Sequence, residues 1–254
     1  MNASRQSVVP DAERQARIDL AACHRLAARF GFNEGIDNHL TMLVPGRAER
    51  CYLAPFGLLW SEVRASQLLE LDFAGKVVAG RGLVEDTALY IHLSVHRQLP
   101  AARCVLHTHM PYATALSMLE DPRLEMASQA AIGFHDEIAY VDYNGLALDY
   151  SEGERLARAM GNKPVALLRN HGVLIIGHSP AQAFERLYFL ERACQAQLLA
   201  LSSGRALHRV PEPIVEATAA QFKACTEVGG EGRTELHFAA LKRLLDRLEA
   251  DYAS

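Results

Sequence analysis

The stretch CVLHTHMPY, residues 104–112, decides how this chain of 254 amino acids is interpreted. Its first residues suit a buried β-strand, and in an extended strand side chains two residues apart point to the same face. His107 and His109 would therefore present two imidazoles side by side, where valine or isoleucine would serve a strand better. Such a pair can chelate a metal ion, but two histidines that only form hydrogen bonds at a sheet end explain the pattern equally well.

A third histidine in another β-rich segment favours the metal. The segment VALLRNHGVLIIG, residues 165–177, contains His171 within NHG, a sequence suited to a tight connection that aims a side chain into a cleft. Three neutral imidazoles with an open position are the usual arrangement of a catalytic zinc or similar divalent site. Cys104, three residues before the first histidine, points to the opposite face of the strand and is not counted as a ligand. The expected ligands are His107, His109 and His171.

The composition is typical of a soluble globular protein. Half of the residues are hydrophobic, 22% are charged, and the formal net charge is −4, which argues against a basic nucleic-acid-binding face. No apolar run is long enough to cross a bilayer, and the opening residues do not have the pattern of a secretory signal. The five cysteines are widely spaced, so we interpret them as reduced thiols of a cytoplasmic protein. The expected partner is a small-molecule substrate, not nucleic acid or a membrane.

The order of the predicted elements indicates the fold class. Helical spacing of apolar residues predicts a helix over residues 11–30, and short β-like runs between residues 39 and 80 predict a meander of strands. Mixed α and β elements without a strict βαβ rhythm predict a largely antiparallel sheet flanked by helices. The next predicted elements are a helix at 85–99, a strand at 103–109, a helix from Pro111, a strand at 137–143 and a helix around 151–160. They are followed by the β-rich segment 165–177, a helix from about Pro180 to Ser202, and two closing helices.

Several motifs, in this order, resemble the class II aldolase/adducin family, which includes L-fuculose-phosphate aldolase and L-ribulose-phosphate 4-epimerase. They are DNHLTMLVPG, LAPFGLLWSE, CVLHTHMPYATALS, LLRNHGVLIIG and the helix AFERLYFLERACQAQ. The resemblance implies one domain over residues 1–254, with a short N-terminal extension, C-terminal helices and a three-layer α/β/α fold around a mostly antiparallel sheet. It also implies a homotetramer with one divalent metal per chain, expected to be zinc, with manganese, cobalt or iron as alternatives. The ligands that match are the three histidines already singled out.

The chain departs from the sugar-phosphate aldolases of that family at the phosphate site. Those enzymes carry Ser-Ser-Glu at the start of the helix before the H-x-H strand, where the serines bind phosphate and the glutamate handles a proton. The alignment places Asp86, Thr87 and Ala88 there. Asp86 would repel a phosphate, and Ala88 cannot transfer a proton. Phe56, before Gly57, also replaces an expected hydroxyl, so the site is closer to the adducin-like branch and a substrate without phosphate is expected.

Proton transfer must then fall to another group. The expected catalytic residues are Tyr112, Glu85 and Asp86, with a metal-bound water as the alternative. Tyr112 is preferred because it follows His109 by three residues and would lean over the site from the first helical turn, although packing explains it equally well. The expected substrate-binding residues are Asn38, His39, Phe56, Gly57, Thr87 and Arg169.

The predicted activity is that of a metal-dependent lyase. A hydroxy- or keto-acid would be cleaved through a metal-stabilised enolate, as in an aldolase. Loss of carbon dioxide from an aromatic or hydroxy acid is the alternative, because decarboxylation needs no base to deprotonate a hydroxyl. A non-catalytic, adducin-like binding scaffold is the second alternative, but a scaffold has no reason to keep three metal ligands.

Overall fold

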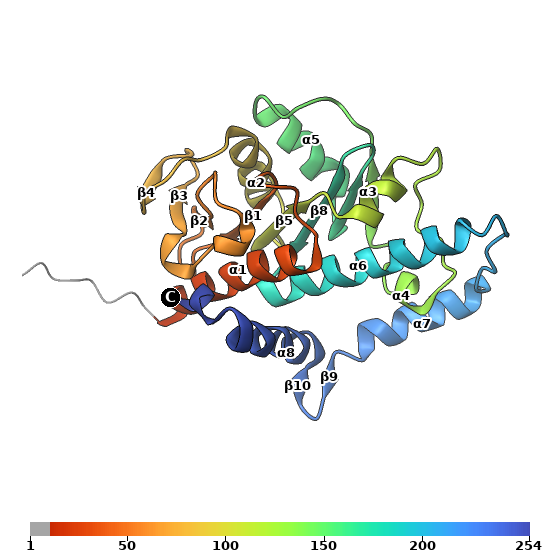
Figure 1. The fold of residues 1–254 in the computed structure, drawn as a ribbon. Coiled ribbons are helices and arrows are strands. Elements are labelled where there is room, and N and C mark those ends of the chain that lie inside the picture. Colours follow the sequence, from red (N-terminus) through yellow and green to blue (C-terminus); the bar gives the residue numbers. More distant parts are fainter. Residues whose placement is uncertain (1–10) are drawn as a thin grey trace, which may run out of the picture.

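A single eight-stranded sheet forms the centre of the protein in a computed structural model that describes residues 11–254 (Figure 1). The strand order is β4-β3-β2-β1-β5-β8-β7-β6, and neighbouring strands are antiparallel except for the parallel pair β6 and β7. This confirms the mostly antiparallel sheet. The strands are β1 (His39–Leu43), β2 (Arg50–Leu53), β3 (Leu69–Asp72), β4 (Val77–Ala79), β5 (Cys104–Thr108), β6 (Ile138–Val141), β7 (Val165–Leu168) and β8 (Gly172–Gly177).

Helices cover both faces of the sheet, which confirms the three-layer α/β/α arrangement. One face packs against α1, α3 and α6, with α8 outside them, and the other face packs against α2 and α5 (Figure 1). The expected N-terminal extension lies in residues 1–10, outside the described part of the chain. The helices are α1 (Asp11–Phe30), α2 (Asp86–Gln98), α3 (Pro111–Ser117), α4 (Gln129–Ile132), α5 (Tyr150–Met160), α6 (Pro180–Leu201), α7 (Glu212–Ala224) and α8 (Arg233–Leu248).

Strand β5 runs through the middle of the sheet and is buried on both faces. Cys104 and Leu106 belong to the core beneath α1 and α6, whereas Val105 belongs to the core beneath α2 and α5. Because side chains alternate along a strand, His107 follows Val105 onto the α2–α5 side. The first histidine therefore emerges at the end of a strand whose other residues are fixed by two cores.

Some short elements were not predicted individually. Strand β3 contains Glu70, which is buried and pairs with Arg47 at 3.1 Å and Arg50 at 3.4 Å. A buried acid interrupts the apolar pattern, and the arginines that neutralise it come from another part of the chain. Helix α4 and the hairpin of β9 (Glu227–Val228) and β10 (Glu231–Gly232) were also missed, because each spans only two to four residues.

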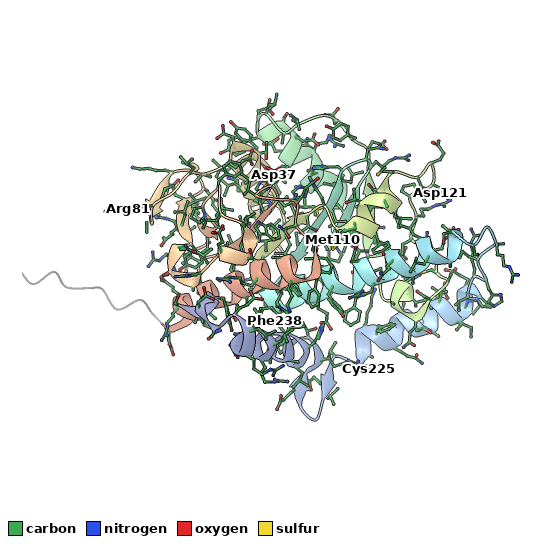
Figure 2. The ribbon with its side chains drawn as sticks, in the orientation of Figure 1. Asp37, Arg81, Met110, Asp121, Cys225 and Phe238 are labelled. Atoms are coloured by element: carbon green, nitrogen blue, oxygen red, sulfur yellow. The ribbon has the colours of Figure 1, made fainter. Side chains whose placement is uncertain are left out.

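The C-terminal helices pack on the α1–α6 side of the domain. Phe238, labelled on α8 in Figure 2, is buried. Its ring centroid lies 6.3 Å from that of Phe184 of α6. Leu245, two turns further along α8, is completely buried in the same core. None of the helices in the described residues is both long and apolar enough to cross a membrane.

A buried carboxylate holds the start of α3, where the chain leaves β5. Glu191 of α6 is 3% exposed, and its two carboxylate oxygens accept the backbone N–H groups of Tyr112 and Ala113, each at 2.8 Å. These N–H groups have no acceptor within the first turn of the helix, and an anion is favourable at that end. Burial raises the pKa of Glu191. The contact fixes the direction of the chain directly after His109.

Replacing Glu191 by alanine should destabilise the fold. Two buried N–H groups would lose their acceptors, so the free energy of unfolding should fall by about 2–4 kcal/mol. Glu191→Gln keeps one carbonyl acceptor and should lose less. Urea unfolding measures both, with Arg192→Ala, an exposed neighbour on α6, as the control. Equal stability of Glu191→Ala and the parent would show that this contact is not structural.

Candidate metal centre

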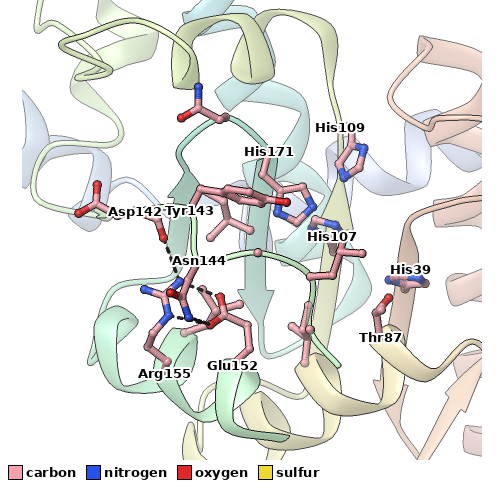
Figure 3. Close-up of a pocket in the computed structure, with 17 residues that line it drawn as sticks. His39, Thr87, His107, His109, Asp142, Tyr143, Asn144, Glu152, Arg155 and His171 are labelled. Carbon is pink, nitrogen blue, oxygen red and sulfur yellow. Dashed lines mark hydrogen bonds and ion pairs between the residues drawn. The ribbon is translucent and has the colours of Figure 1, made fainter. Parts of the chain in front are cut away.

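Three histidines from neighbouring strands meet at one end of the sheet (Figure 3). His107 lies in β5, His109 follows the end of that strand, and His171 lies in the turn between β7 and β8. Their ring centroids are 4.8–5.0 Å apart, and one ring nitrogen of each lies within 4.8 Å of the others. The structure thus brings together the three predicted ligands, close enough to share one ion.

Hydrogen bonds fix which nitrogen of two rings is free. The Nδ1 of His107 lies 2.9 Å from the carbonyl oxygen of Val173, and the Nδ1 of His109 lies 2.5 Å from a carboxylate oxygen of Glu34. Each Nδ1–H donates, which leaves Nε2 with its lone pair, the arrangement common in metal-bound histidines. Among the described residues, no group donates to the buried Nε2 of His109. A divalent ion would satisfy this nitrogen, so the residues fit a metal.

Burial and crowding keep the imidazoles of His107 and His171 neutral. Burial lowers the pKa of His107 well below its ordinary value, and the neighbouring histidines lower it further. Burial is the main reason why the pKa of His171 is lowered to about 4, and repulsion from His109 is the second. Neutral imidazole is the form that binds a metal, so near neutral pH His107 and His171 do not have to release protons when an ion binds.

The backbone around His171 explains the NHG sequence. Asn170 has a φ of 57°, a left-handed conformation that asparagine adopts more readily than most residues. At Gly172, a Cβ atom would lie 2.5 Å from the carbonyl oxygen of Thr108 and 2.8 Å from the ring of His109. Only glycine allows the two strands to approach this closely. The third ligand is therefore aimed by its two neighbours in sequence.

Asn38 positions a ligand and does not line the cavity at the metal centre. It is buried, and its Oδ1 accepts the backbone N–H groups of Glu34 at 3.0 Å and His109 at 3.3 Å. Asn38 thereby links the loop that carries Glu34 to the chain just beyond β5. The role predicted for it, binding a substrate oxygen, gains no support from this position.

The three histidines line a cavity of about 220 Å³ (Figure 3). This volume is small for a ligand pocket and limits the site to a small molecule. Tyr143 packs edge-on against His171, with ring centroids 6.2 Å apart. His39 and Thr87, two of the six predicted substrate-binding residues, also line the cavity. Most other lining side chains come from the segment after β6 and from α5, and several are apolar. They include Ile91, Asn144, Leu146, Glu152, Arg155, Leu156 and Leu168.

Glu85 is the N-cap of α2, and its carboxylate turns back toward the helix. One oxygen accepts from the backbone N–H of Ala88 at 2.9 Å, the hydroxyl of Thr87 at 2.5 Å and Nε2 of His39 at 2.9 Å. Burial acts to raise the pKa of Glu85, but these hydrogen bonds bring it down to about 2. A carboxylate therefore lies beside position 88 although that residue is alanine.

Tyr112 does not take the predicted position over the metal centre. Its side chain is partly buried against the core beneath α1 and α6, and it does not line the cavity. Helix α3 begins at Pro111 with its first N–H groups held by Glu191, and this helical turn carries the ring to the other side. The prediction that Tyr112 leans over the site is therefore corrected.

Four other predicted residues also lie away from this cavity. Arg169 donates to the carbonyl oxygens of Leu119 and Glu120, at 3.4 and 3.3 Å, and so connects loops instead of receiving a substrate carboxylate. The remaining three do not line it either: Asp86 and Gly57 lie exposed elsewhere, and Phe56 borders a separate cavity of about 20 Å³.

Sequence reasoning missed several polar residues of the site, among them Glu34, Glu152 and Arg155. Glu34 lies in a short loop between Gly31 and Gly35 and carries no pattern that indicates a role. Glu152 and Arg155 belong to the charged helix α5, where acids and bases at helical spacing are typical of a solvent-exposed face. Their position in the cavity depends on how α5 packs against the sheet, which the local pattern does not reveal.

Comparison with known proteins places this geometry in a family. The model of the Class II Aldolase and Adducin N-terminal domain matches residues 18–198. The chain belongs to the class II aldolase/adducin family. A putative aldolase class 2 protein of Caulobacter vibrioides is 34% identical over 248 residues, which cover 96% of this chain and 94% of that protein. Rat alpha-adducin is also 34% identical, over 93% of this chain but only 34% of its own length.

Solved structures agree with this membership. The crystal structure of an aldolase II superfamily protein from Pseudomonas syringae is 36% identical and has a TM-score of 0.89, with both chains fully covered. L-fuculose 1-phosphate aldolase from Glaciozyma antarctica has a TM-score of 0.81 over 99% of this chain and 96% of its own. At 24% identity, the second similarity shows a shared fold and no more.

We expect one divalent ion per chain at this centre. His171→Ala removes one of three ligands and should leave most of the protein without metal, whereas Glu34→Gln should weaken binding about 10- to 100-fold because it loosens His109. Elemental analysis after purification without chelator measures the occupancy. His178→Ala, an exposed histidine just beyond β8, should keep full occupancy. Full metal content in His171→Ala would show that the ligand assignment is wrong.

Proposed function

We propose that this protein is a divalent-metal-dependent carbon–carbon lyase acting on a small, non-phosphorylated hydroxy- or keto-acid. The observation that carries the proposal is the convergence of His107, His109 and His171 on a cavity. A bound metal would polarise a carbonyl group and stabilise the negative charge left when a carbon–carbon bond breaks. Three imidazoles suit zinc, and also cobalt, iron or manganese in a less selective site.

Two features support a substrate without phosphate. The N-terminus of α2, which would attract a phosphate, already binds the carboxylate of Glu85. The adjoining cavity beside Phe56 has a volume of about 20 Å³, enough for roughly one water molecule. A phosphate placed there would face an ionised carboxylate, a repulsion on the order of a few kcal/mol in a partly buried site.

We assign proton transfer to His39 together with Glu85. His39 stands directly opposite His107 in the pairing of β1 with β5, and the two rings stack with centroids 5.8 Å apart. The Nε2–H of His39 donates to Glu85 at 2.9 Å, which fixes the tautomer and leaves Nδ1 as the basic nitrogen. A histidine–carboxylate pair would thus do the work of the glutamate that is missing at position 88.

Decarboxylation at the same centre is the second candidate. The apolar side chains of Ile91, Leu156 and Leu168 suit an aromatic or hydroxy acid, and loss of carbon dioxide makes a smaller demand on a base. The similarity to alpha-adducin favours a third role, a binding scaffold, for which the histidines would be unnecessary. We also propose that the protein is a homo-oligomer. The family resemblance implies that this oligomer is a tetramer.

A substrate screen of the metal-loaded protein tests the proposal. Hydroxy- and keto-acids are offered with and without phosphate, and released aldehyde and carbon dioxide are measured separately. We expect cleavage that depends on the metal and acts on a non-phosphorylated acid. Efficient cleavage of fuculose or ribulose phosphates would refute the substrate assignment, and a protein that binds no metal would favour the scaffold.

With a substrate in hand, two substitutions distinguish the proton-transfer residues. Glu85→Gln should lower turnover by about 10²- to 10⁴-fold at unchanged metal content, because His39 loses the carboxylate that orients it. Tyr112→Phe should stay within threefold of the parent, since its ring packs in the core. Asp86→Asn, an exposed neighbour, is the control. If Tyr112→Phe lost more turnover than Glu85→Gln, Tyr112 would again be the preferred proton-transfer group.

A further inference from the structure

Building on the proposed function, we propose that Glu152 and Arg155 of α5 form a second recognition site in the same cavity. This pair would bind the distal hydroxyl groups of a polyhydroxy acid whose other end lies at the three histidines. The substrate class is then narrowed from small acids in general to short, non-phosphorylated acids that carry several hydroxyl groups.

The pair is held rigidly where it lines the cavity (Figure 3). Arg155 donates to both carboxylate oxygens of Glu152, from Nε at 2.8 Å and from Nη2 at 2.7 Å. Nη2 also donates to the carbonyl oxygen of Asp142 at 2.9 Å, and Asn144 donates to Glu152 at 3.3 Å. The two side chains are only 13% and 32% exposed, so they are preorganised for a ligand.

Bonding capacity remains on both partners. A carboxylate accepts about four hydrogen bonds, and the described residues supply three to Glu152, two from Arg155 and one from Asn144. Within the described part of the chain, Nη1 of Arg155 donates to no acceptor. The pair thus offers one acceptor position and one donor nitrogen. A hydroxyl group donates and accepts, so two adjacent hydroxyls can use both.

The charge of the pair selects against a second anionic group. Glu152 and Arg155 neutralise each other, and hydrogen bonding from Arg155 lowers the pKa of Glu152, which keeps the carboxylate ionised. A phosphate or second carboxylate at Nη1 of Arg155 would be repelled by the neighbouring carboxylate of Glu152. Neutral hydroxyls meet no such penalty.

The rest of the cavity limits the length of the ligand. Its volume of about 220 Å³ holds a short chain, and Ile91, Leu156 and Leu168 provide apolar walls for the carbon atoms. A purely aromatic acid would fill the same walls but leave the remaining acceptor position on Glu152 and Nη1 of Arg155 without partners. Leaving such groups unpaired is costly, so the pair discriminates in favour of hydroxyl-bearing acids.

Calorimetric binding to the metal-loaded protein tests this proposal without requiring turnover. The probes are 2,3,4-trihydroxybutanoate and 2-hydroxybutanoate, which share the α-hydroxy acid end and differ in the distal hydroxyls. We expect the trihydroxy acid to bind at least tenfold more tightly. Glu152→Gln and, separately, Arg155→Lys should reduce this preference below threefold while the affinity for 2-hydroxybutanoate stays constant, which also shows that each variant is folded.

Glu154→Gln is the matched control. Glu154 lies on the same helix but pairs with Arg158 at 3.5 Å and does not line the cavity, so the tenfold preference should persist. Equal affinity of the parent for both acids, or a preference that survives both variants, would overturn the assignment of Glu152 and Arg155 alone. If neither acid binds to protein shown to contain metal, the hydroxy-acid site itself is wrong, and the proposed function fails with it.

Discussion

The antiparallel pairing of β5 with β8 is the constraint on which the site depends. It places Thr108 opposite Val173 and brings the turn that carries His171 to the end of the strand that carries His107. The contact is so close that residue 172 must be glycine, because a Cβ would collide with the chain at Thr108. Both strands are buried in the middle of the sheet, so two cores hold this register. A shift by one residue would turn His107 to the opposite face and separate the ligands.

Carboxylates of the protein itself complete the surroundings of this centre. Glu85 occupies the N-terminus of α2, Glu191 occupies that of α3, and Glu34 orients His109. The N-terminus of α2, whose Thr87 lines the cavity, has thus already bound an anion, which removes the positive potential that a phosphate would seek. Glu34 and Glu85 place their carboxylates against His109 and His39, which suits a divalent cation nearby. The proposed metal site and the proposed substrate without phosphate would then have a common electrostatic origin.

The sequence was sufficient for features with a local cause. Strand periodicity put His107 and His109 together, and the NHG turn singled out His171. The sequence did not reveal contacts between distant segments. The position of Tyr112 depends on Glu191, 79 residues away, and the contact of Glu34 with His109 spans 75 residues. The alignment compared residue 88 with a catalytic glutamate, yet the carboxylate of the N-cap Glu85 lies against the backbone N–H of residue 88 from three residues earlier. A sequence alignment compares residues at the same position in two chains, whereas the chemistry depends on where the carboxylate group lies in space.

The energetics of the centre bear on the choice between an enzyme and a scaffold. Burial suppresses protonation of His107, and His109 keeps a buried nitrogen without a donor among the described residues. A domain that only binds partners would be more stable with apolar side chains at these places, since buried polar groups without partners cost free energy. The cost is offset when an ion binds, because ligand binding to the folded state adds directly to its stability. Three converging imidazoles, a cavity that adjoins them and a fixed histidine–carboxylate pair are together difficult to explain in a chain that has given up catalysis.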